Sequence, residues 1–553
     1  MRPGPDEHSL TRRALLRLGA LGAFSAGALP GLARAAEQAV PTIDALSVAS
    51  GQPFAADRRL LATISPGSRV RSHAAVRFTL DRAAQVRLEA VRVAQRSERV
   101  VWSAAARLPR GPQRFLWHPD PATPPGNYVM RLTVEDRGRR RVYGERRPRT
   151  PELARAPVVR VLGVDAAFAE RSYGPGQLAR LRIQADAEHL TLELFRSGPE
   201  SVNTNRNDEL NGLPVSEPRT LRWDRHRDGP GAVDVRLGDW PTGLYFARLT
   251  SDDGRVGFAP FVLRPGAFGA TRVAIVLPTN TWQAYNFRDD DGDGWGDTWY
   301  AGGSPPVLLD RPYLNRGVPP FFRRYDLPFL RWLHWTGKRP DYLCDEDLGR
   351  FNGEGLRQAY DLVVFPGHSE YTTEHAFDVV ERYRDLGGNL AFLAANNFFW
   401  RVDRRSNALR RVALWRSLRR PESRLVGTQY RANDDGGRQA PFVVTGADAA
   451  PWLFAGTGLA NGSTFGETVG GYGIEIDART PFSPLETQVL ATIPDLFGPG
   501  VSAEMTYYEA PSGARVFAAG ALDFGGSVTF WPMRRLLENL WSHLTAPRHD
   551  SSR

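Results

Sequence analysis

The stretch Asp361-Leu-Val-Val-Phe-Pro-Gly-His-Ser-Glu-Tyr371 decides how the rest of the chain is interpreted. Its four apolar residues, Leu362 to Phe365, predict a strand that is buried on both faces of a parallel sheet. The Pro-Gly pair ends this strand, so His368 and Glu370 follow at its carboxyl end, which in an open parallel sheet faces the ligand-binding crevice. An imidazole and a carboxylate are costly to bury without partners, so we interpret them as functional groups. A turn with satisfied polar groups is the alternative.

Strands and helices are expected to alternate around this stretch. Further apolar runs predict buried strands at Arg272–Leu277, Asp341–Cys344, Asn389–Ala394 and Arg515–Gly520. Helices are expected at Leu327–Thr336, Thr373–Leu386 and Met533–Leu544. This alternation predicts an α/β domain over 271–545, with a doubly wound parallel sheet and right-handed crossovers. We expect a class-I glutamine amidotransferase-like or flavodoxin-like arrangement, with β insertions between about Val412 and Leu490.

The first half of the chain has a different pattern, in which short alternating strands are separated by turns. Tyr128–Val134 and His189–Phe195 are examples of this alternation. The pattern predicts two β-sandwiches, an immunoglobulin-like or fibronectin-like one over 40–152 and a second one over 158–265. Neither segment contains a cluster of titratable residues, so we expect each to be a spacer, a docking surface or a sugar-binding module.

The amino terminus has the features of an export signal within residues 1–36. The pair Arg12 and Arg13 precedes a moderately apolar run from Leu15 to Leu32, and Ala33-Arg-Ala35 offers small residues for cleavage. The segment resembles a twin-arginine (Tat) signal peptide, with a Sec signal or an uncleaved anchor as alternatives. We therefore expect a periplasmic or secreted protein without a membrane span after cleavage. Export in the folded state would be compatible with a metal that is inserted beforehand.

Composition narrows the function classes. The 553 residues are 42% hydrophobic, which is enough to bury several cores. The net charge is +10, but the cations are spread along the chain and are almost all arginine, with Lys338 as the only lysine. Because no basic stripe with interleaved aromatic residues occurs, nucleic-acid binding is not expected. Cys344 is the only cysteine, so the exported protein would be held together without disulfides.

Three of the predicted strands are followed by polar and aromatic residues. The segments concerned are 277–286, 367–371 and 394–400. Because the carboxyl ends of parallel strands meet at one edge of a sheet, these segments should lie close together. Their Tyr, Asn, His, Glu and Trp side chains predict a polar pocket with aromatic walls.

These segments resemble the carboxy-terminal domain of the N,N-dimethylformamidase large (beta) subunit and its relatives. The residues that carry the resemblance are Thr281-Trp-Gln-Ala-Tyr-Asn286, Asp310-Arg-Pro312, Gly367-His-Ser-Glu-Tyr371, Gly388–Trp400, Gly470–Asp477 and Gly513–Gly520. The similarity covers roughly Val273 to Trp541. It implies a hydrolase that cleaves a carbon–nitrogen bond in a small amide. Many relatives have no assigned activity, so the resemblance does not decide the substrate.

The resemblance also implies a mononuclear iron bound by two tyrosinates and one glutamate. Tyr285 and Glu370 would be two of these ligands. His368 and Asn396 would lie nearby as catalytic groups that transfer protons or orient the carbonyl, with Glu370 counted among the catalytic residues. Hard oxygen donors suit a ferric ion, which lowers the pKa of bound water and polarises an amide carbonyl.

Several tyrosines are candidates for the second tyrosinate. We predict Tyr325, from its distance along the chain and its place just before a helix. The competing candidates are Tyr300, Tyr313 and Tyr342. The alternative to the whole metal site is that Tyr285 and Tyr371 are ordinary wall aromatics and His368 is a hydrogen-bonded core residue.

A second candidate metal site follows Tyr285 directly, in Asp289-Asp-Asp-Gly-Asp-Gly-Trp-Gly-Asp297. The predicted calcium ligands have the spacing of a calcium loop and are Asp289, Asp291, Asp293 and Asp297. Gly294 permits the sharp turn, but Tyr300 stands where such loops usually carry a bidentate acid. We predict an isolated calcium loop that would hold the segment carrying Tyr285, with a solvated acidic turn as the alternative. This loop is not expected in the formamidase itself.

The chain lacks the residues that other amidase mechanisms require. Cys344 does not lie at a nucleophile elbow, and no Gly-x-Ser-x-Gly stands between a strand and a helix. The leading expectation is therefore an exported metal-dependent hydrolase whose partner is a small amide. One alternative is a non-catalytic calcium-binding envelope protein that binds a glycan or a protein. Another alternative is a hydrolase with the same scaffold that acts on a sugar or a peptide. The sequence leaves a homo-oligomer open.

Overall fold

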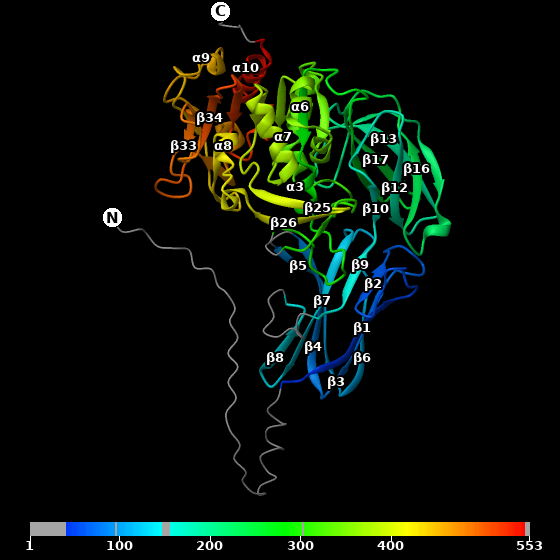
Figure 1. Cartoon of the computed structure of the whole chain (residues 1–553). Coiled ribbons are helices and arrows are strands. Elements are labelled where there is room, and N and C mark those ends of the chain that lie inside the picture. Colours follow the sequence, from blue (N-terminus) through cyan, green and yellow to red (C-terminus); the bar gives the residue numbers. More distant parts are fainter. Residues whose placement is uncertain (1–39, 95–96, 146–154, 301–303, 548–553) are drawn as a thin grey trace, which may run out of the picture.

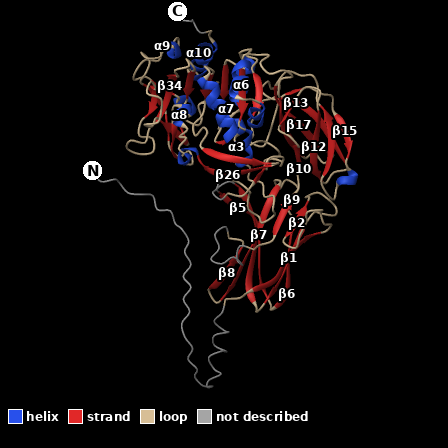
Figure 2. Cartoon of the chain, in the orientation of Figure 1, coloured by secondary structure: helices blue, strands red, loops and turns tan. Residues whose placement is uncertain are grey.

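The computed structural model describes residues 40–94, 97–145, 155–300 and 304–547 (Figure 1). The predicted Tat signal at 1–36 lies outside these residues. Within them, sheets provide most of the regular structure and helices are few, in a multidomain arrangement (Figure 2). In the same ranges, every helix is too short or too polar to cross a membrane.

The first unit, at the bottom of Figure 1, consists of two sheets that share one core, consistent with the predicted β-sandwich. One sheet has the order β1 (Ile43–Ser50), β3 (Ala74–Leu80) and β6 (Gly111–Trp117). The other has the order β2 (Leu61–Ile64), β9 (Val158–Val161), β7 (Gly126–Asp136), β4 (Ala84–Ala94) and β5 (Ser97–Leu108), with β8 (Arg139–Tyr143) paired to β7. Trp117 packs against Tyr128 in the shared core, with ring centroids 5.2 Å apart.

The second unit is again a pair of sheets around a common core, consistent with the second predicted sandwich. The smaller sheet has the order β10 (Val164–Phe168), β12 (Leu178–Ala185) and β16 (Gly231–Arg236). The larger has the order β11 (Ser172–Tyr173), β18 (Val256–Leu263), β17 (Gly243–Ser251), β13 (His189–Arg196) and β14 (Leu213–Pro214), with β15 (Arg219–Arg222) paired to β13.

The carboxy-terminal half contains a nine-stranded sheet whose first five strands run parallel. These are, in order, β21 (Asp341–Cys344), β19 (Val273–Leu277), β22 (Leu362–Phe365), β24 (Asn389–Phe392) and β35 (Arg515–Ala518). An antiparallel extension continues the sheet through β34 (Ala503–Glu509), β33 (Gln488–Ile493), β29 (Phe442–Val444) and β30 (Thr464–Phe465).

The parallel strands are buried on both faces, as the uninterrupted apolar runs predicted. Along β22, Leu362 and Val364 belong to one hydrophobic cluster, whereas Val363 and Phe365 belong to the cluster on the opposite face. This follows from the two-residue period of a strand. Each such side chain contributes about 1.5–3 kcal/mol by leaving water.

Helices cover the two faces of this sheet (Figures 1 and 2). The helices are α3 (Thr279–Ala284), α4 (Phe322–Tyr325), α5 (Leu327–Trp335), α6 (Gly353–Ala359), α7 (Glu374–Asp385), α8 (Ser423–Val426), α9 (Pro451–Phe454) and α10 (Met533–Thr545). One small sheet has the order β20 (Val307–Leu308), β26 (Ala408–Leu414), β25 (Trp400–Arg405) and β23 (Tyr371–Thr373). Two short ladders pair β27 (Gln429–Asn433) with β32 (Glu475–Ala478) and β28 (Gln439–Ala440) with β31 (Tyr472–Gly473).

Helix α3 is not among the helices predicted from the sequence. A six-residue helix is not stable alone, so its formation depends on tertiary packing. All six of its residues are buried, and Trp282 packs edge-on against Phe322 with ring centroids 6.0 Å apart. This packing places Tyr285, which caps the carboxyl end of α3, at the edge of the parallel sheet.

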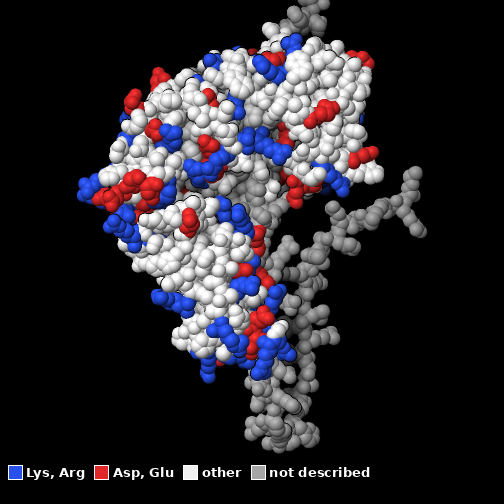
Figure 3. Space-filling model, turned by 180° about the vertical axis from the view of Figure 1, so that it is seen from behind, with Lys and Arg blue, Asp and Glu red and all other residues white. Residues whose placement is uncertain are grey.

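The charged residues are interspersed on the face seen from behind (Figure 3). Arg and Asp or Glu side chains alternate over that surface, and no broad area of one sign is visible there. This distribution agrees with the spread of arginine along the sequence.

Candidate functional site

The first feature of the site is a direct contact between Tyr285 and Glu370. The Tyr285 hydroxyl donates a hydrogen bond to Oε2 of Glu370. The two residues are 9% and 4% exposed, so this pair is shielded from bulk water. The backbone N–H of Glu370 also donates to Oγ1 of Thr281 on α3, at 3.1 Å. The segments after β19 and β22 therefore meet, as their positions in the sequence predicted.

His368 and Asn396 lie in the same buried cluster and meet at a carboxylate that the sequence analysis did not single out, Glu475 of β32. His368 Nε2 lies 3.0 Å from Glu475 Oε2 and 3.7 Å from Glu370 Oε2. Asn396 Nδ2 donates to the same Glu475 oxygen at 2.9 Å. Glu475 is part of the Gly470–Asp477 motif, but it does not follow a predicted parallel strand, so sequence position gave no reason to place it here.

Asp477 was also missed, and it holds Asn396 in place. The backbone N–H of Asn396 donates to both carboxylate oxygens of Asp477, at 2.8 and 3.0 Å. Asn396 has a φ of 55°, in the left-handed region that asparagine tolerates better than most residues. The alternation of buried Glu475 and Asp477 along β32 is the signal that could have identified them.

The pKa values in this cluster reflect burial of several acids around one imidazole. Burial raises the pKa of Glu370 to about 7, opposed by the positive charge of His368 and increased by the negative charge of Glu475. Burial also raises the pKa of Asp477 to about 7. For His368, burial lowers the pKa, but the charges of Glu475, Glu370 and Asp477 outweigh this effect and raise it to about 9.

The Tyr285 hydroxyl has its pKa well above the usual value, because it is buried and lies beside the Glu370 carboxylate. A phenol in this position keeps its proton unless positive charge is placed next to it. The site thus has more buried acidic groups than cations, which favours a bound cation.

The predicted second tyrosine, Tyr325, lies at the end of a row of aromatic rings that starts at Tyr285. The ring centroids are 4.9 Å apart for Tyr285 and Tyr300, 5.8 Å for Tyr300 and Phe321, and 5.4 Å for Phe321 and Tyr325. Burial raises the pKa of Tyr325, and the negative charges of Asp523 and Glu475 add to this effect. Glu475 thus links Tyr325 electrostatically to the cluster.

The other tyrosines have different surroundings. Burial and the charge of Glu370 raise the pKa of Tyr371 well above its usual value, and its ring centroid lies 6.1 Å from that of Tyr285. Tyr313 is buried in the large apolar cluster on one face of the sheet. Tyr342 lies on β21, where its backbone N–H donates to Oγ1 of Thr242 in the second sandwich. Of the alternatives considered, Tyr300 has its ring directly against Tyr285.

The residues around Glu370 fit a hard metal ion. Among the described residues, Ser369 Oγ and Asn396 Oδ1 are buried oxygens without a hydrogen-bond partner. Together with the carboxylates and phenols they provide oxygen ligands, the type that ferric and other hard cations prefer. Gly367 is required for the close packing, because a Cβ there would lie 2.3 Å from Oδ1 of Asp326.

The acidic loop also brings its carboxylates together. Ligand atoms of Asp289, Asp291 and Asp297 lie within 4.8 Å of one another. Asp289 accepts hydrogen bonds from the backbone N–H groups of Gly292 and Gly294, at 2.6 and 2.7 Å. Burial raises the pKa of Asp289 to about 7, and it raises the pKa of Asp297 as well.

Asp293, the fourth predicted ligand, is not part of that group of three. Its Oδ1 accepts a hydrogen bond from the backbone N–H of Trp295 at 2.8 Å. Burial raises its pKa, and the charges of Asp291 and Asp297 add to the shift.

The side chains of Asn127 and Arg311 attach the acidic loop to its surroundings. Asn127 of the first sandwich donates to Asp289 Oδ2 at 2.8 Å. Arg311, which is 4% exposed, donates to Asp290 Oδ2 at 2.7 Å and to the carbonyl oxygens of Gln283 and Asp297 at 2.8 Å. The same buried guanidinium therefore joins the loop to α3, which positions Tyr285.

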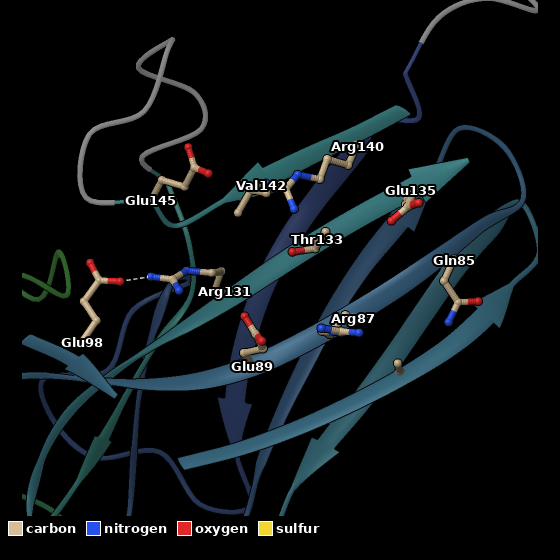
Figure 4. Close-up of a pocket in the computed structure, with 11 residues that line it drawn as sticks. Gln85, Arg87, Glu89, Glu98, Arg131, Thr133, Glu135, Arg140, Val142 and Glu145 are labelled. Atoms are coloured by element: carbon tan, nitrogen blue, oxygen red, sulfur yellow. Dashed lines mark hydrogen bonds and ion pairs between the residues drawn. The ribbon is translucent and has the colours of Figure 1, made fainter. Parts of the chain in front are cut away.

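A cavity of about 610 Å³ lies on the first sandwich, and its residues come from β4, β5, β7 and β8 (Figure 4). Acids and arginines alternate along this face, and Arg131 pairs with Glu98. None of the residues around Glu370 lines it. We interpret it as a solvated sheet face, because its four glutamates and three arginines nearly balance and no aromatic side chain lines it.

Comparison with known proteins places the chain in a family. The chain belongs to the family described as N,N-dimethylformamidase beta subunit-like, C-terminal, which matches residues 232–535. That range includes every residue placed in the site around Glu370 and in the acidic loop.

Two relatives with a described activity are N,N-dimethylformamidase beta subunits from Alcaligenes sp and Paracoccus aminophilus. Each is 24% identical to this chain over 303 residues, which is 44% of this chain and 40% of the relative. The matched part thus spans well under half the length of these relatives.

Two solved structures overlap part of the chain. A Salmonella alpha-2-macroglobulin reacted with methylamine overlaps 40% of this chain and 16% of its own, with 9% identity and a TM-score of 0.22. An Escherichia coli alpha-2-macroglobulin activated by porcine elastase has 12% identity and a TM-score of 0.17, over 41% of this chain and 20% of its own. Scores this low carry no argument about fold or function.

Proposed function

We propose that this protein is an exported, iron-dependent hydrolase that cleaves the carbon–nitrogen bond of a small linear amide. The observation that carries the proposal is the buried contact between Tyr285 and Glu370, with His368 beside it. Membership of the formamidase-like family and the similarity to two formamidase subunits support the reaction class. The amino-terminal sequence supports Tat export to the periplasm or outside.

The proposed fold of the catalytic domain is a doubly wound sheet of the flavodoxin type. The parallel strands have the spatial order β21-β19-β22-β24-β35, which is 2-1-3-4-5 in chain order. This order places a switch point between β19 and β22, where ligands of such sheets bind. Tyr285 and Glu370 follow these two strands.

We propose that Tyr285, Tyr325 and Glu370 hold the iron. When bound, a ferric ion would polarise the amide carbonyl and lower the pKa of a water molecule. Asn396 would orient the carbonyl through its side-chain amide, with Asp477 fixing its backbone. The aromatic rings around Tyr285 would exclude bulk water from the pocket.

His368 would move the proton. It would accept one from the attacking water and return it to the leaving amine. Its pKa of about 9 means that it holds a proton in the metal-free cluster, so it can act as a base only when added positive charge beside Glu370 lowers that pKa. Glu475, 3.0 Å away, would orient the imidazole and stabilise its charged form.

Metal analysis combined with visible absorption tests this proposal. The purified protein is expected to contain about one iron per chain and to show a tyrosinate-to-iron charge-transfer band. It should release amine from N,N-dimethylformamide or a related small amide. Protein that contains no iron, shows no band and leaves these amides intact after reconstitution with iron would contradict the proposal.

A second candidate function is calcium binding at the acidic loop, without catalysis, in an envelope protein that binds a glycan or a protein partner. The observation that favours it is the grouping of Asp289, Asp291 and Asp297. Titration with calcium in the micromolar to millimolar range tests the binding. Calcium uptake together with absence of iron would favour this function over the hydrolase.

A further inference from the structure

A cavity of about 430 Å³ lies between the second sandwich and helix α5. None of the residues around Glu370 lines it. One wall comes from the end of β13 and the turn before β17, and includes Arg196 and Trp240. The other comes from α5 and the segment that leads to β21, and includes Leu330 and Leu333. The volume is in the range of small-molecule sites.

The cavity has cations that the protein does not neutralise. Within the described part of the chain, neither Arg196 nor Arg339 forms an ion pair, and both line the cavity. His334 also lines it, and its pKa is lowered by burial and then by the positive charges of both arginines. The positive charges of the two guanidinium groups therefore both reach the part of the cavity next to His334.

Other charges at the cavity are weaker or already engaged. Lys338 pairs with Glu538 at 2.7 Å. The Asp341 carboxylate is buried and accepts a hydrogen bond from the Tyr360 hydroxyl at 2.9 Å. Asp239 is exposed at the rim and is the remaining acid among the described residues that line the cavity. In all, three cations (Arg196, Lys338 and Arg339) and two acids (Asp239 and Asp341) line the cavity, and the two arginines are the cations without an acidic partner among the described residues.

The cavity also contains a buried hydroxyl without a partner. Ser197 is 4% exposed and lines the cavity beside Arg196, and its Oγ has no hydrogen-bond partner among the described residues. A buried polar group that lacks a partner costs stability, so such a group usually serves a ligand or a water molecule. The oxygen itself is not accessible from the cavity in this structure, so a rotation about the Cα–Cβ bond is needed before it can donate to an anionic oxygen that also binds the arginines.

We infer that this cavity binds a small organic carboxylate with an apolar, ring-sized body. Arg196 and Arg339 bind the carboxylate through charge-assisted hydrogen bonds, and Ser197 donates a further one. The body of the ligand lies against Trp240 and Leu333, where it leaves water. The site is separate from the proposed amide-cleaving centre and does not depend on it.

Isothermal titration of the full-length protein with 2-naphthoate tests this inference. The probe combines a carboxylate with a flat apolar body, and 2-naphthamide has the same shape without the charge. We expect 2-naphthoate to bind and 2-naphthamide to bind at least about tenfold more weakly, because charge-assisted hydrogen bonds are lost. Each of the variants Arg196→Gln and Arg339→Gln should weaken the binding of 2-naphthoate by a similar factor. Arg219→Gln, at an exposed arginine of the same sandwich, should leave it unchanged.

A variant that fills the cavity tests the site without changing its charge. A Cβ at Gly266, which lines the cavity, would meet no atom closer than 3.9 Å, so Gly266→Trp should fold and fill the space. It should abolish binding. Glu370→Ala should bind 2-naphthoate like the unchanged protein, which separates this site from the proposed iron centre. The inference is overturned if the folded protein does not bind 2-naphthoate, or if Gly266→Trp and Arg339→Gln bind it as well as the unchanged chain.

Discussion

The cluster around Glu370 and the acidic loop at Asp289–Asp297 are two groups of acids that are built in opposite ways, the first fully buried and the second only partly so. The cluster takes its side chains from segments more than 180 residues apart, from Tyr285 to Glu475. The loop takes its side chains from nine consecutive residues, with backbone N–H groups of the same loop holding Asp289. The first depends on the whole sheet, whereas the second depends mainly on local turns.

This difference predicts how each site responds to substitution. A group within the cluster has neighbours from several strand ends, so its loss should disturb metal binding and chemistry together. A carboxylate of the loop should affect calcium uptake and local stability, and should reach the cluster only through Arg311 and α3.

The largest effect is expected for Glu370→Ala. Removal of this carboxylate should lower the iron content to below about a tenth of the original and reduce amide hydrolysis more than about a hundredfold. Elemental analysis and an amine-release assay measure both quantities, with circular dichroism to verify folding. Glu486→Ala, at an exposed glutamate, is the control and should change neither. A folded Glu370→Ala protein that retains its iron would refute the role of this residue.

A somewhat smaller effect is expected for Tyr325→Phe. If Tyr325 supplies the second phenolate, the charge-transfer band should shift or vanish and iron affinity should fall about tenfold or more. Tyr313→Phe, in the apolar cluster, should leave the band in place. The band is recorded by visible spectroscopy on iron-loaded protein. An unchanged band in Tyr325→Phe, with a changed one in Tyr300→Phe or Tyr371→Phe, would assign the ligand to one of the tyrosines closer to Tyr285.

An intermediate effect is expected for Glu475→Gln. This change keeps the shape of the side chain but removes the charge that helps to raise the pKa of His368, and it should lower kcat about ten- to a hundredfold while the iron content is kept. Steady-state kinetics and metal analysis on the same preparation separate an effect on kcat from an effect on iron content. Equal losses of iron and of activity would instead make Glu475 a metal ligand.

The smallest effect is expected for Asp289→Asn. In the unchanged protein, 1 mM calcium should raise Tm by a few degrees, because a ligand that binds only the folded state stabilises it by about 1–3 kcal/mol at this excess. The shift should be lost in Asp289→Asn and reversed by a chelator, as followed by thermal denaturation. Asp44→Asn, on the first sandwich, serves as the matched control. A calcium shift that persists in Asp289→Asn would show that the loop is not the binding site.

The strands of the parallel sheet could be predicted because their apolar runs are uninterrupted. Leu362–Phe365 and Asp341–Cys344 were predicted with the same bounds that the structure has. The helix after β19 could not, because α3 is six residues long and exists only through the burial of residues such as Trp282. Short elements that depend on packing leave little periodicity in the sequence.

The candidate site could be predicted in part for the same reason. Tyr285, His368, Glu370 and Asn396 follow predicted strands, and the structure brings them together. Glu475 and Asp477 come from the inserted region between Val412 and Leu490, where their own alternation is the one local signal and does not say which part of the sheet they approach. β32 is attached to the parallel sheet by a bridge between Ile476 and Ala521 and by the bond from the Asp477 N–H to the Gly520 carbonyl oxygen, just after β35. These contacts join residues more than 40 positions apart, so no local pattern predicts them.

The sequence by itself determined which strands are buried and which polar residues stand at their ends, because apolar periodicity and chain order are local properties. It also determined the spacing of the acidic loop. Only the tertiary structure decided that Glu475 lies against His368, that the Tyr285 phenol lies on the Glu370 carboxylate, and that Arg196 and Arg339 face one cavity. Those contacts join residues far apart in the chain, and their energies depend on burial, which exists only once the sheets have packed.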